Sequence, residues 1–144
     1  MIDYNSFYQR WYSYSKSDLK RIAKEGQEVI LRSYGSDSLH GNSYYDNIIE
    51  TAFYADGSAT YDELDFFNST SNYKQIDLTE LNRICRQAWE VCEYYDTIPN
   101  NKNNRGSEVA NAVIVITLCA CLIDGSFKPG EIRYINKLVG YNLI

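Results

Sequence analysis

The stretch VANAVIVITLCACLI, residues 109–123, constrains how the rest of the chain can fold. A helix built from it is apolar on every face, which is typical of a helix surrounded by other helices rather than one lying on a surface. Its valines and isoleucines would also suit a buried strand. Buried strands usually span about four to eight residues, so a run of about fifteen favours a helix. We therefore expect this segment to be the buried central helix of an all-α protein.

The segments on both sides of this run predict amphipathic helices that can cover it. Apolar residues recur at three- and four-residue spacing after Ser17, which we expect to cap a helix. The same spacing occurs over residues 43–54, and a long amphipathic helix opens with Asp77 and Glu80 as a capping pair. Pro129 is placed to begin the last helix. No pattern of strands and hairpins occurs, so the fold class is all-α.

The length of 144 residues fits one domain that can bury a core without disulfides or metal. We expect a bundle of about six or seven helices, arranged as two related helix-turn-helix halves around the buried central helix. Within this single domain, 1–144, residues 1–42 form an aromatic N-terminal segment and an amphipathic helix. Residues 43–144 form the helical core.

Composition and charge narrow the classes of protein to which the chain can belong. There is no apolar leader at the start, and the longest apolar run is shorter than the roughly twenty residues that a membrane span needs. The four cysteines lack metal-binding spacing, so we expect reduced thiols in a cytoplasmic protein without membrane contact.

Residues 36–80 carry nine acidic side chains against one lysine, within a net charge of −5. This acidic stretch argues against nucleic-acid binding and favours a cation or a basic protein surface as partner.

An Asp-Gly turn occurs twice, in AFYADGSATYDELDFF (residues 52–67) and in ACLIDGSFKPGEIRYI (residues 120–135). A shift of 68 positions aligns the two glycines and, six positions further on, two glutamates, so the chain looks internally duplicated. A glycine followed at this distance by glutamate is also the second half of an EF-hand calcium loop. The first half is absent, because Ala52 and Ala120 stand at the first ligand position. We therefore exclude a standard EF-hand.

Two interpretations of these turns remain open. In the structural one, Gly57 and Gly125 take the left-handed conformation that ends a helix, and Thr60 and Glu63 form a capping box for the next helix. Glu131 has no such partner, and we expect its carboxylate mainly to oppose the helix dipole. In the other interpretation, the acids of the turns bind a divalent cation, namely calcium. We favour the structural interpretation, because carboxylates are common at helix starts on structural grounds alone.

The two turns resemble those of the TerB-like domains of tellurite-resistance proteins, in which each Asp-Gly ends an apolar helix and precedes a helix with glutamate in its first turn. The second copy, LIDGSFKPGE, is the more similar, and the resemblance covers roughly residues 44–141. It implies an all-helical bundle of two related halves, an acidic surface that holds a divalent cation, and a role in stress or phage-resistance gene neighbourhoods rather than catalysis. The matching positions are Asp56, Glu63, Asp124 and Glu131. In this chain Lys128, Pro129 and Gly130 replace a more acidic second loop.

The N-terminal stretch YNSFYQRWYSY, residues 4–14, gathers more aromatic surface than one helix face normally hides. Tyrosine and tryptophan bury much area at low entropic cost, so Tyr8, Trp11 and Tyr12 are a predicted interface with another protein or a second copy of the chain. In the alternative interpretation Phe7 and Trp11 pack on the bundle while the tyrosines border the water.

The side chains expected in an enzyme are scarce. His40 is the only histidine, which leaves little material for a metal-histidine site or a nucleophile pair, so we predict no enzyme and no required cofactor.

Two hypotheses for the function follow. The first is a TerB-like module that contacts another protein, and calcium dependence would favour it. The second is an acidic inhibitor from a phage or mobile element that occupies a basic nucleic-acid-binding groove of a host defence enzyme, and steep salt dependence would favour it.

Overall fold

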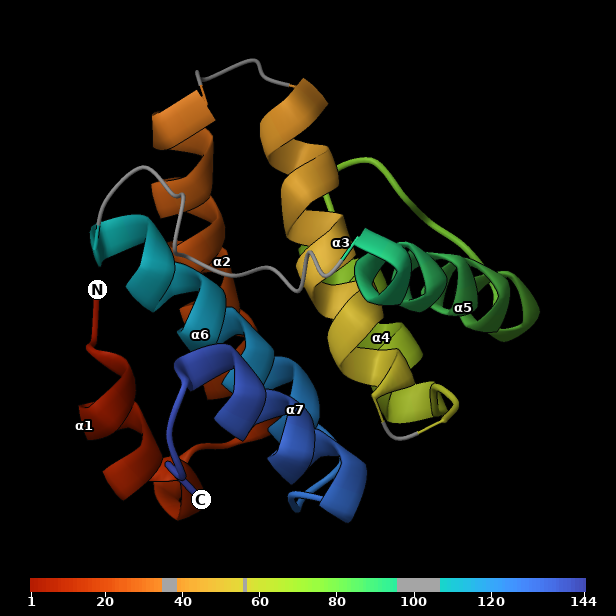
Figure 1. Cartoon of the computed structure of the whole chain (residues 1–144). Helices are drawn as coiled ribbons and strands as arrows, with labels where there is room; N and C mark the ends of the chain where they lie inside the picture. Colours follow the sequence, from red (N-terminus) through yellow and green to blue (C-terminus); the bar gives the residue numbers. More distant parts are fainter. Residues whose placement is uncertain (35–38, 56, 96–106) are drawn as a thin grey trace.

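The computed structural model describes residues 1–34, 39–55, 57–95 and 107–144. In this part of the chain the protein is all-α, as expected, with seven α-helices and one short 3₁₀ turn (Figure 1). The elements are α1 (Tyr4–Gln9), η1 (Trp11–Ser13), α2 (Lys16–Tyr34), α3 (Leu39–Tyr54), α4 (Tyr61–Thr70), α5 (Leu78–Tyr95), α6 (Ser107–Leu122) and α7 (Pro129–Val139).

Helix α6 is the enclosed helix that its sequence predicts. It packs against α2, α3 and α7, and α1 lies beside it near the N-terminus (Figure 1). Every residue of 112–123 is buried, and the ring of Phe7 from α1 is buried in the same core. Helix α5 packs mainly on α3, on the far side of the bundle from α1 (Figure 1).

Side chains at the helix starts confirm one of the predicted caps and correct another. Asp77 accepts a hydrogen bond from the backbone N–H of Glu80 at 2.8 Å, as expected for the start of α5. The prediction for Ser17 is wrong, because Ser15 caps α2. The Ser15 hydroxyl accepts from the N–H of Asp18, and the Asp18 carboxylate accepts from the N–H of Ser15, at 3.1 and 3.0 Å. Asp18 stands three residues after Ser15 and closes this reciprocal pair, which leaves Ser17 inside the first turn.

The helix boundaries repeat with the shift of 68 positions found in the sequence. Helix α3 ends at Tyr54 and α6 at Leu122, and α4 begins at Tyr61 and α7 at Pro129. Equivalent apolar residues that face the core, such as Ile48 and Ile116, are fully buried in both copies. The α3–α4 and α6–α7 pairs are therefore two helix-turn-helix units with matching boundaries.

Ile116→Asp is expected to prevent folding. Ile116 is fully buried where α2 approaches α6 at Gly26, so the variant would place a carboxylate without a partner in the core, at a cost above about 4 kcal/mol. Ile116→Val is the control, since removing one methylene costs only about 1 kcal/mol. Thermal unfolding followed by circular dichroism distinguishes the two. A cooperative transition of Ile116→Asp near the wild-type temperature would show that α6 is not the core.

Candidate functional site: the carboxylates of the two Asp-Gly turns

Both Asp-Gly turns have the backbone geometry that the structural interpretation predicts. Gly57 and Gly125 take φ values of 108° and 106°, in the left-handed region. The N–H of Gly57 donates to the carbonyl of Tyr54 at 2.9 Å, and that of Gly125 to the carbonyl of Leu122 at 2.8 Å. These bonds close the last turn of α3 and of α6 in the same way.

The two equivalent glutamates both point back to the start of their helix. One oxygen of Glu63, Oε1, accepts from the N–H and the hydroxyl of Thr60 at 2.8 and 3.1 Å, and the Thr60 hydroxyl accepts from the Glu63 N–H. Glu131 Oε1 accepts from the N–H of Lys128 at 2.9 Å. The expectation that Glu131 mainly opposes the helix dipole is therefore incomplete, because its carboxylate also caps the first N–H of the turn.

Burial brings the carboxyl groups of the two turns into one electrostatic environment. Glu63 and Glu131 are only 2% and 0% exposed. Burial, reinforced by the charge of Asp124, raises the pKa of Glu63 to about 7, although the hydrogen bonds from Thr60 oppose the shift. Burial together with Asp124 and Glu63 raises the pKa of Glu131 to about 8 against the bond from Lys128. Glu63, Asp124 and Glu131, with Lys128, are called the carboxylate cluster below.

Lys128 is the cation of this cluster. Its ammonium forms an ion pair with Asp124 Oδ2, four residues earlier in the chain. Partial burial lowers the pKa of Lys128, but the bond to Asp124 and the nearby negative charges outweigh that effect and raise it. Asp124 Oδ1 and Glu131 Oε2 are buried and accept no hydrogen bond within the described part of the chain. The second turn is thus already neutralised in part by its own lysine.

The described residues do not form a coordination shell for a divalent cation. Of the four predicted ligands, Glu63, Asp124 and Glu131 lie at the cluster, whereas Asp56 lies outside the described residues. Among the residues with described positions, no three His, Cys, Asp or Glu side chains are grouped so that they could hold a metal ion. A calcium site at the first turn stays a prediction.

A second buried acidic pair was not predicted from the sequence. Asp46 and Glu50 of α3 are each 2% exposed. Lys74 forms an ion pair with Glu50 at 3.3 Å, and the Ser71 hydroxyl donates to Asp46 at 3.2 Å. Burial raises the pKa of Glu50 to about 7 and also raises that of Asp46, in both cases against the attraction of Lys74. The signal that could have revealed this pair is that Lys74 is the single lysine or arginine within residues 36–80.

Each of the two interpretations of the aromatic N-terminus holds for some of its residues. Phe7 is fully buried and stacks on Tyr14 with 5.0 Å between ring centroids. Trp11 and Tyr8 both contact Phe127 of the second Asp-Gly turn, at 5.6 and 6.1 Å, whereas Tyr12 remains 76% exposed. Packing on the bundle thus accounts for Phe7 and in part for Trp11, but not for Tyr12.

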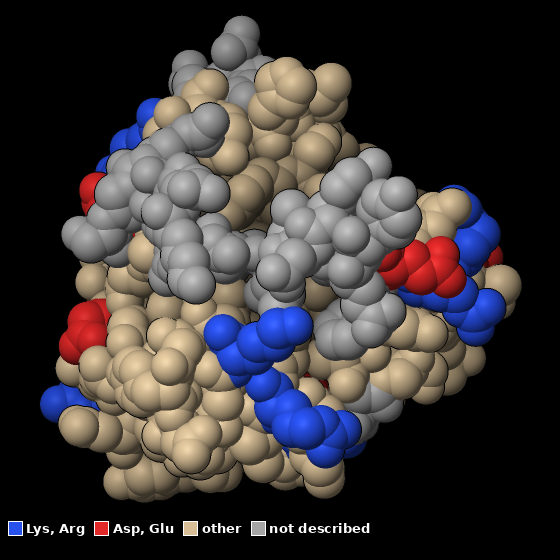
Figure 2. All heavy atoms as spheres, in the orientation of Figure 1, with Lys and Arg blue, Asp and Glu red and all other residues tan. Residues whose placement is uncertain are grey.

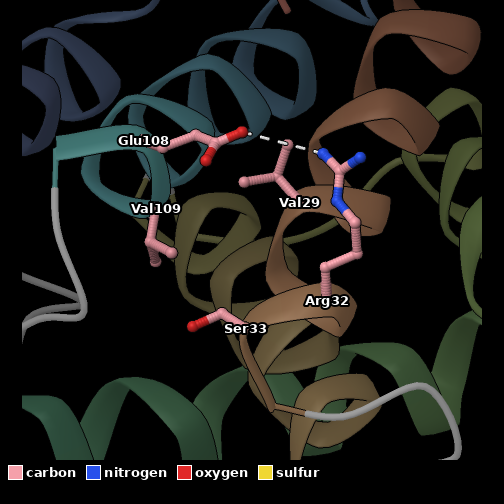
Figure 3. A pocket seen from close by; sticks show the side chains of 5 residues that line it. All are labelled: Val29, Arg32, Ser33, Glu108 and Val109. Carbon is pink, nitrogen blue, oxygen red and sulfur yellow. Dashed lines mark ion pairs between the residues drawn. The ribbon is translucent and has the colours of Figure 1, made fainter.

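A pocket of about 510 Å³ opens between α2 and α6, away from both turns (Figure 3). Val29, Arg32 and Ser33 line it from α2, and Glu108 and Val109 from α6. Arg32 and Glu108 face each other across it at 3.7 Å, and both side chains are exposed. Its described charged groups pair with one another in water, so the pocket offers a ligand little electrostatic attraction.

Comparison with known proteins gives no match among family models, curated proteins or solved structures. The resemblance to TerB-like domains therefore depends on the paired turns alone and stays a prediction.

Replacing Gly57 or Gly125 by valine should lower the free energy of unfolding by about 1–3 kcal/mol, because a β-branched residue resists a positive φ. A Cβ at either position would meet no atom within 4 Å, so the expected loss is conformational rather than steric. Asparagine tolerates the left-handed region, so Gly57→Asn and Gly125→Asn are matched controls. Urea unfolding measures the difference. Equal stability of the valine and asparagine variants would contradict the role of the glycines.

The free energy of unfolding should fall as pH rises from about 5 to about 8. Glu50, Glu63 and Glu131 have raised pKa values in the folded protein, so they retain protons there after the unfolded chain has released them near pH 4.5. More protons bound by the folded state means that stability decreases with pH, until the folded pKa values of about 7 to 8 are passed.

Glu50→Gln should reduce this fall by on the order of 2 kcal/mol, since one of the shifted groups is removed. Glu80→Gln is the control, because its hydrogen bond with Arg83 lowers the pKa of Glu80, so the contribution of Glu80 to stability is constant from pH 5 to pH 8 and is lost only in acid. Urea unfolding at a series of pH values measures both. A stability that rises from pH 5 to pH 8 would show that these carboxyl groups are ionised and satisfied in the folded protein.

Proposed function

We propose that this chain is a non-enzymatic TerB-like helical module that acts through contact with another protein, in a bacterial stress or phage-resistance setting. The observation that carries the proposal is the aromatic surface formed by Tyr8, Trp11 and Tyr12. Tyr12 is 76% exposed. Figure 2 shows that the part of this face over α1 and the C-terminal end carries few charged side chains.

The aromatic surface is held in place by the fold. Phe127 supports the rings of Tyr8 and Trp11, and Trp11 makes an edge contact with Tyr12 at 6.2 Å. The hydroxyls of Tyr4 and Tyr141 lie 2.7 Å apart and tie the two ends of the chain together. Rings that are already ordered lose little conformational entropy when a partner covers them. These contacts favour a binding role over simple exposure.

The acidic inhibitor hypothesis needs a continuous negative surface, and the described acids supply little of it. Within residues 36–80, Asp46, Glu50 and Glu63 are buried. Three further acids pair with bases, namely Asp62 with Lys16, Asp65 with Lys20 and Glu80 with Arg83. Much of the acidic stretch is therefore used inside the protein or neutralised at its surface, which weakens the argument for a basic groove as partner.

A cytoplasmic location is part of the proposal. Cys85, Cys119 and Cys121 are buried free thiols, which is compatible with a reducing compartment. No described helix is both long and apolar enough to cross a membrane.

Tyr12→Ala should weaken capture of the partner at least about tenfold while leaving the thermal unfolding temperature unchanged, because Tyr12 contributes exposed area and little core packing. Tyr61→Ala on α4 is a matched control, since Tyr61 is also 76% exposed. Affinity purification from a bacterial host lysate, followed by affinity measurement with the purified partner, tests both variants.

The same measurement at several salt concentrations separates the two hypotheses. Binding through uncharged aromatic rings should change little with salt, whereas occupation of a basic groove should weaken steeply. Equal binding by Tyr12→Ala and wild type, or an equal loss in Tyr61→Ala, would contradict the aromatic surface as the binding site.

A further inference from the structure

The connection between α4 and α5 lies against two buried carboxyl groups of α3. This connection, residues 71–77, is called the strap below, and it leads past α3 to the start of α5 (Figure 1). The Ser71 hydroxyl donates to Asp46 Oδ2 at 3.2 Å, and the Lys74 ammonium contacts both oxygens of Glu50 at 3.3 Å. Asp46 and Glu50 are each only 2% exposed. The strap is therefore part of what covers them.

Side chains of α2 and α3 hold the strap from the other side of these contacts. Asn72 Nδ2 donates to Asn42 Oδ1 of α3 at 2.9 Å, and Lys24 of α2 donates to Asn72 Oδ1 at 3.1 Å. Gln27 of α2 donates to the carbonyl of Thr70, just before the strap, at 2.9 Å. A polar network of this kind is favourable only while every member is satisfied. A change of charge at one member therefore affects how firmly the whole strap is held.

Helix α5 depends on the same support as the strap that precedes it. It packs mainly on α3, with fewer contacts to α4, and its residues Leu81 and Cys85 are fully buried. A segment attached mainly at one face can open locally without unfolding of the whole protein. The other ionisable groups that interact with the two carboxyls or with Lys74 are Lys24 on α2, Tyr45 on α3, and Glu80 and Cys85 on α5.

We propose that the strap and α5 form a pH-sensitive latch, which detaches from α3 as one unit when Asp46 and Glu50 become ionised. Burial raises the pKa of Glu50 to about 7 and also raises that of Asp46, in both cases against the attraction of Lys74. In the open latch water reaches Glu50, and its pKa returns toward the usual 4.5. The open form thus binds fewer protons than the closed form, so rising pH opens the latch.

This inference does not depend on the proposed partner. Helix α5 lies on the far side of the bundle from α1, which carries part of the aromatic surface (Figure 1). A latch that fails its test would leave the aromatic surface untouched, and the reverse also holds.

Labelling of Cys85 by iodoacetamide, followed by mass spectrometry, measures the opening, because this thiol is fully buried in the closed latch. Cys119 of α6 is the internal control, since it is equally buried and becomes accessible only when the whole bundle unfolds. Cys85 should react faster than Cys119 in the wild-type protein at every pH from 6 to 8.

Glu50→Gln separates the opening from the intrinsic reactivity of the thiol. The variant cannot ionise at this position, whereas the intrinsic reactivity of Cys85 is the same in both proteins. The Cys85 rate of wild type divided by that of Glu50→Gln should therefore rise about tenfold from pH 6 to pH 8, as a shift of the Glu50 pKa from 4.5 to about 7 requires.

Lys74→Met tests the ion pair within the latch. Glu50 is mostly protonated at pH 6 and mostly ionised at pH 8, so the loss of its cation should raise Cys85 labelling about threefold at pH 8 and much less at pH 6. Lys16→Met is the control, because Lys16 pairs with Asp62 of α4 and not with the strap. It should be labelled as wild type is.

Equal labelling of Cys85 and Cys119 in the wild-type protein would overturn the proposal, because α5 would then leave α3 only on global unfolding. A ratio of wild-type to Glu50→Gln rates that stays constant or falls from pH 6 to pH 8 would overturn it as well. If Glu50→Gln does not fold, Lys74→Met decides. A larger effect at pH 8 than at pH 6 supports the latch, and an equal effect at both contradicts it.

Discussion

Burial of α6 on all sides is the constraint on which the rest of the structure depends. A helix without a polar face cannot lie at a surface, so α2, α3 and α7 each turn an apolar stripe toward it, and α1 adds the ring of Phe7. Helix α7 directly follows α6 and returns to it through the second Asp-Gly turn, since a left-handed glycine reverses the chain directly after the end of the helix.

This arrangement buries carboxylates in the interior of the protein. Because each turn lies against the core, the glutamate that caps the following helix is buried with it, and the charge of Asp124 raises the pKa of both glutamates. A surface capping box costs nothing in desolvation, but Glu63 and Glu131 lose most of their contact with water. Lys128, which pairs with Asp124, limits that desolvation cost at the second turn. Lys74 does the same for the buried Glu50. The same fold that hides the apolar helix thus creates two sets of buried charges.

The internal use of acids has a consequence for function. A chain of net charge −5 with a strongly acidic middle third would present a negative surface if those acids were exposed. In the described structure they are mostly buried or paired, whereas Tyr12 of the aromatic surface is exposed. Contact through the aromatic surface fits this distribution better than electrostatic capture of a basic groove.

The sequence by itself determined the helical class, the central position of residues 109–123, the duplicated turns and the cap at Glu63. Each depends on spacing along one helix or on the backbone freedom of glycine, and both are local properties. The electrostatic effect of Glu63 on Glu131, the ion pair of Glu50 with Lys74 and the support of Trp11 by Phe127 were decided only by the tertiary structure. These contacts join residues that are 24 or more positions apart, and nothing in local spacing fixes which distant helix ends come together. For the same reason the raised pKa values of the buried carboxyl groups could not be predicted, since desolvation depends on what the whole fold places around them.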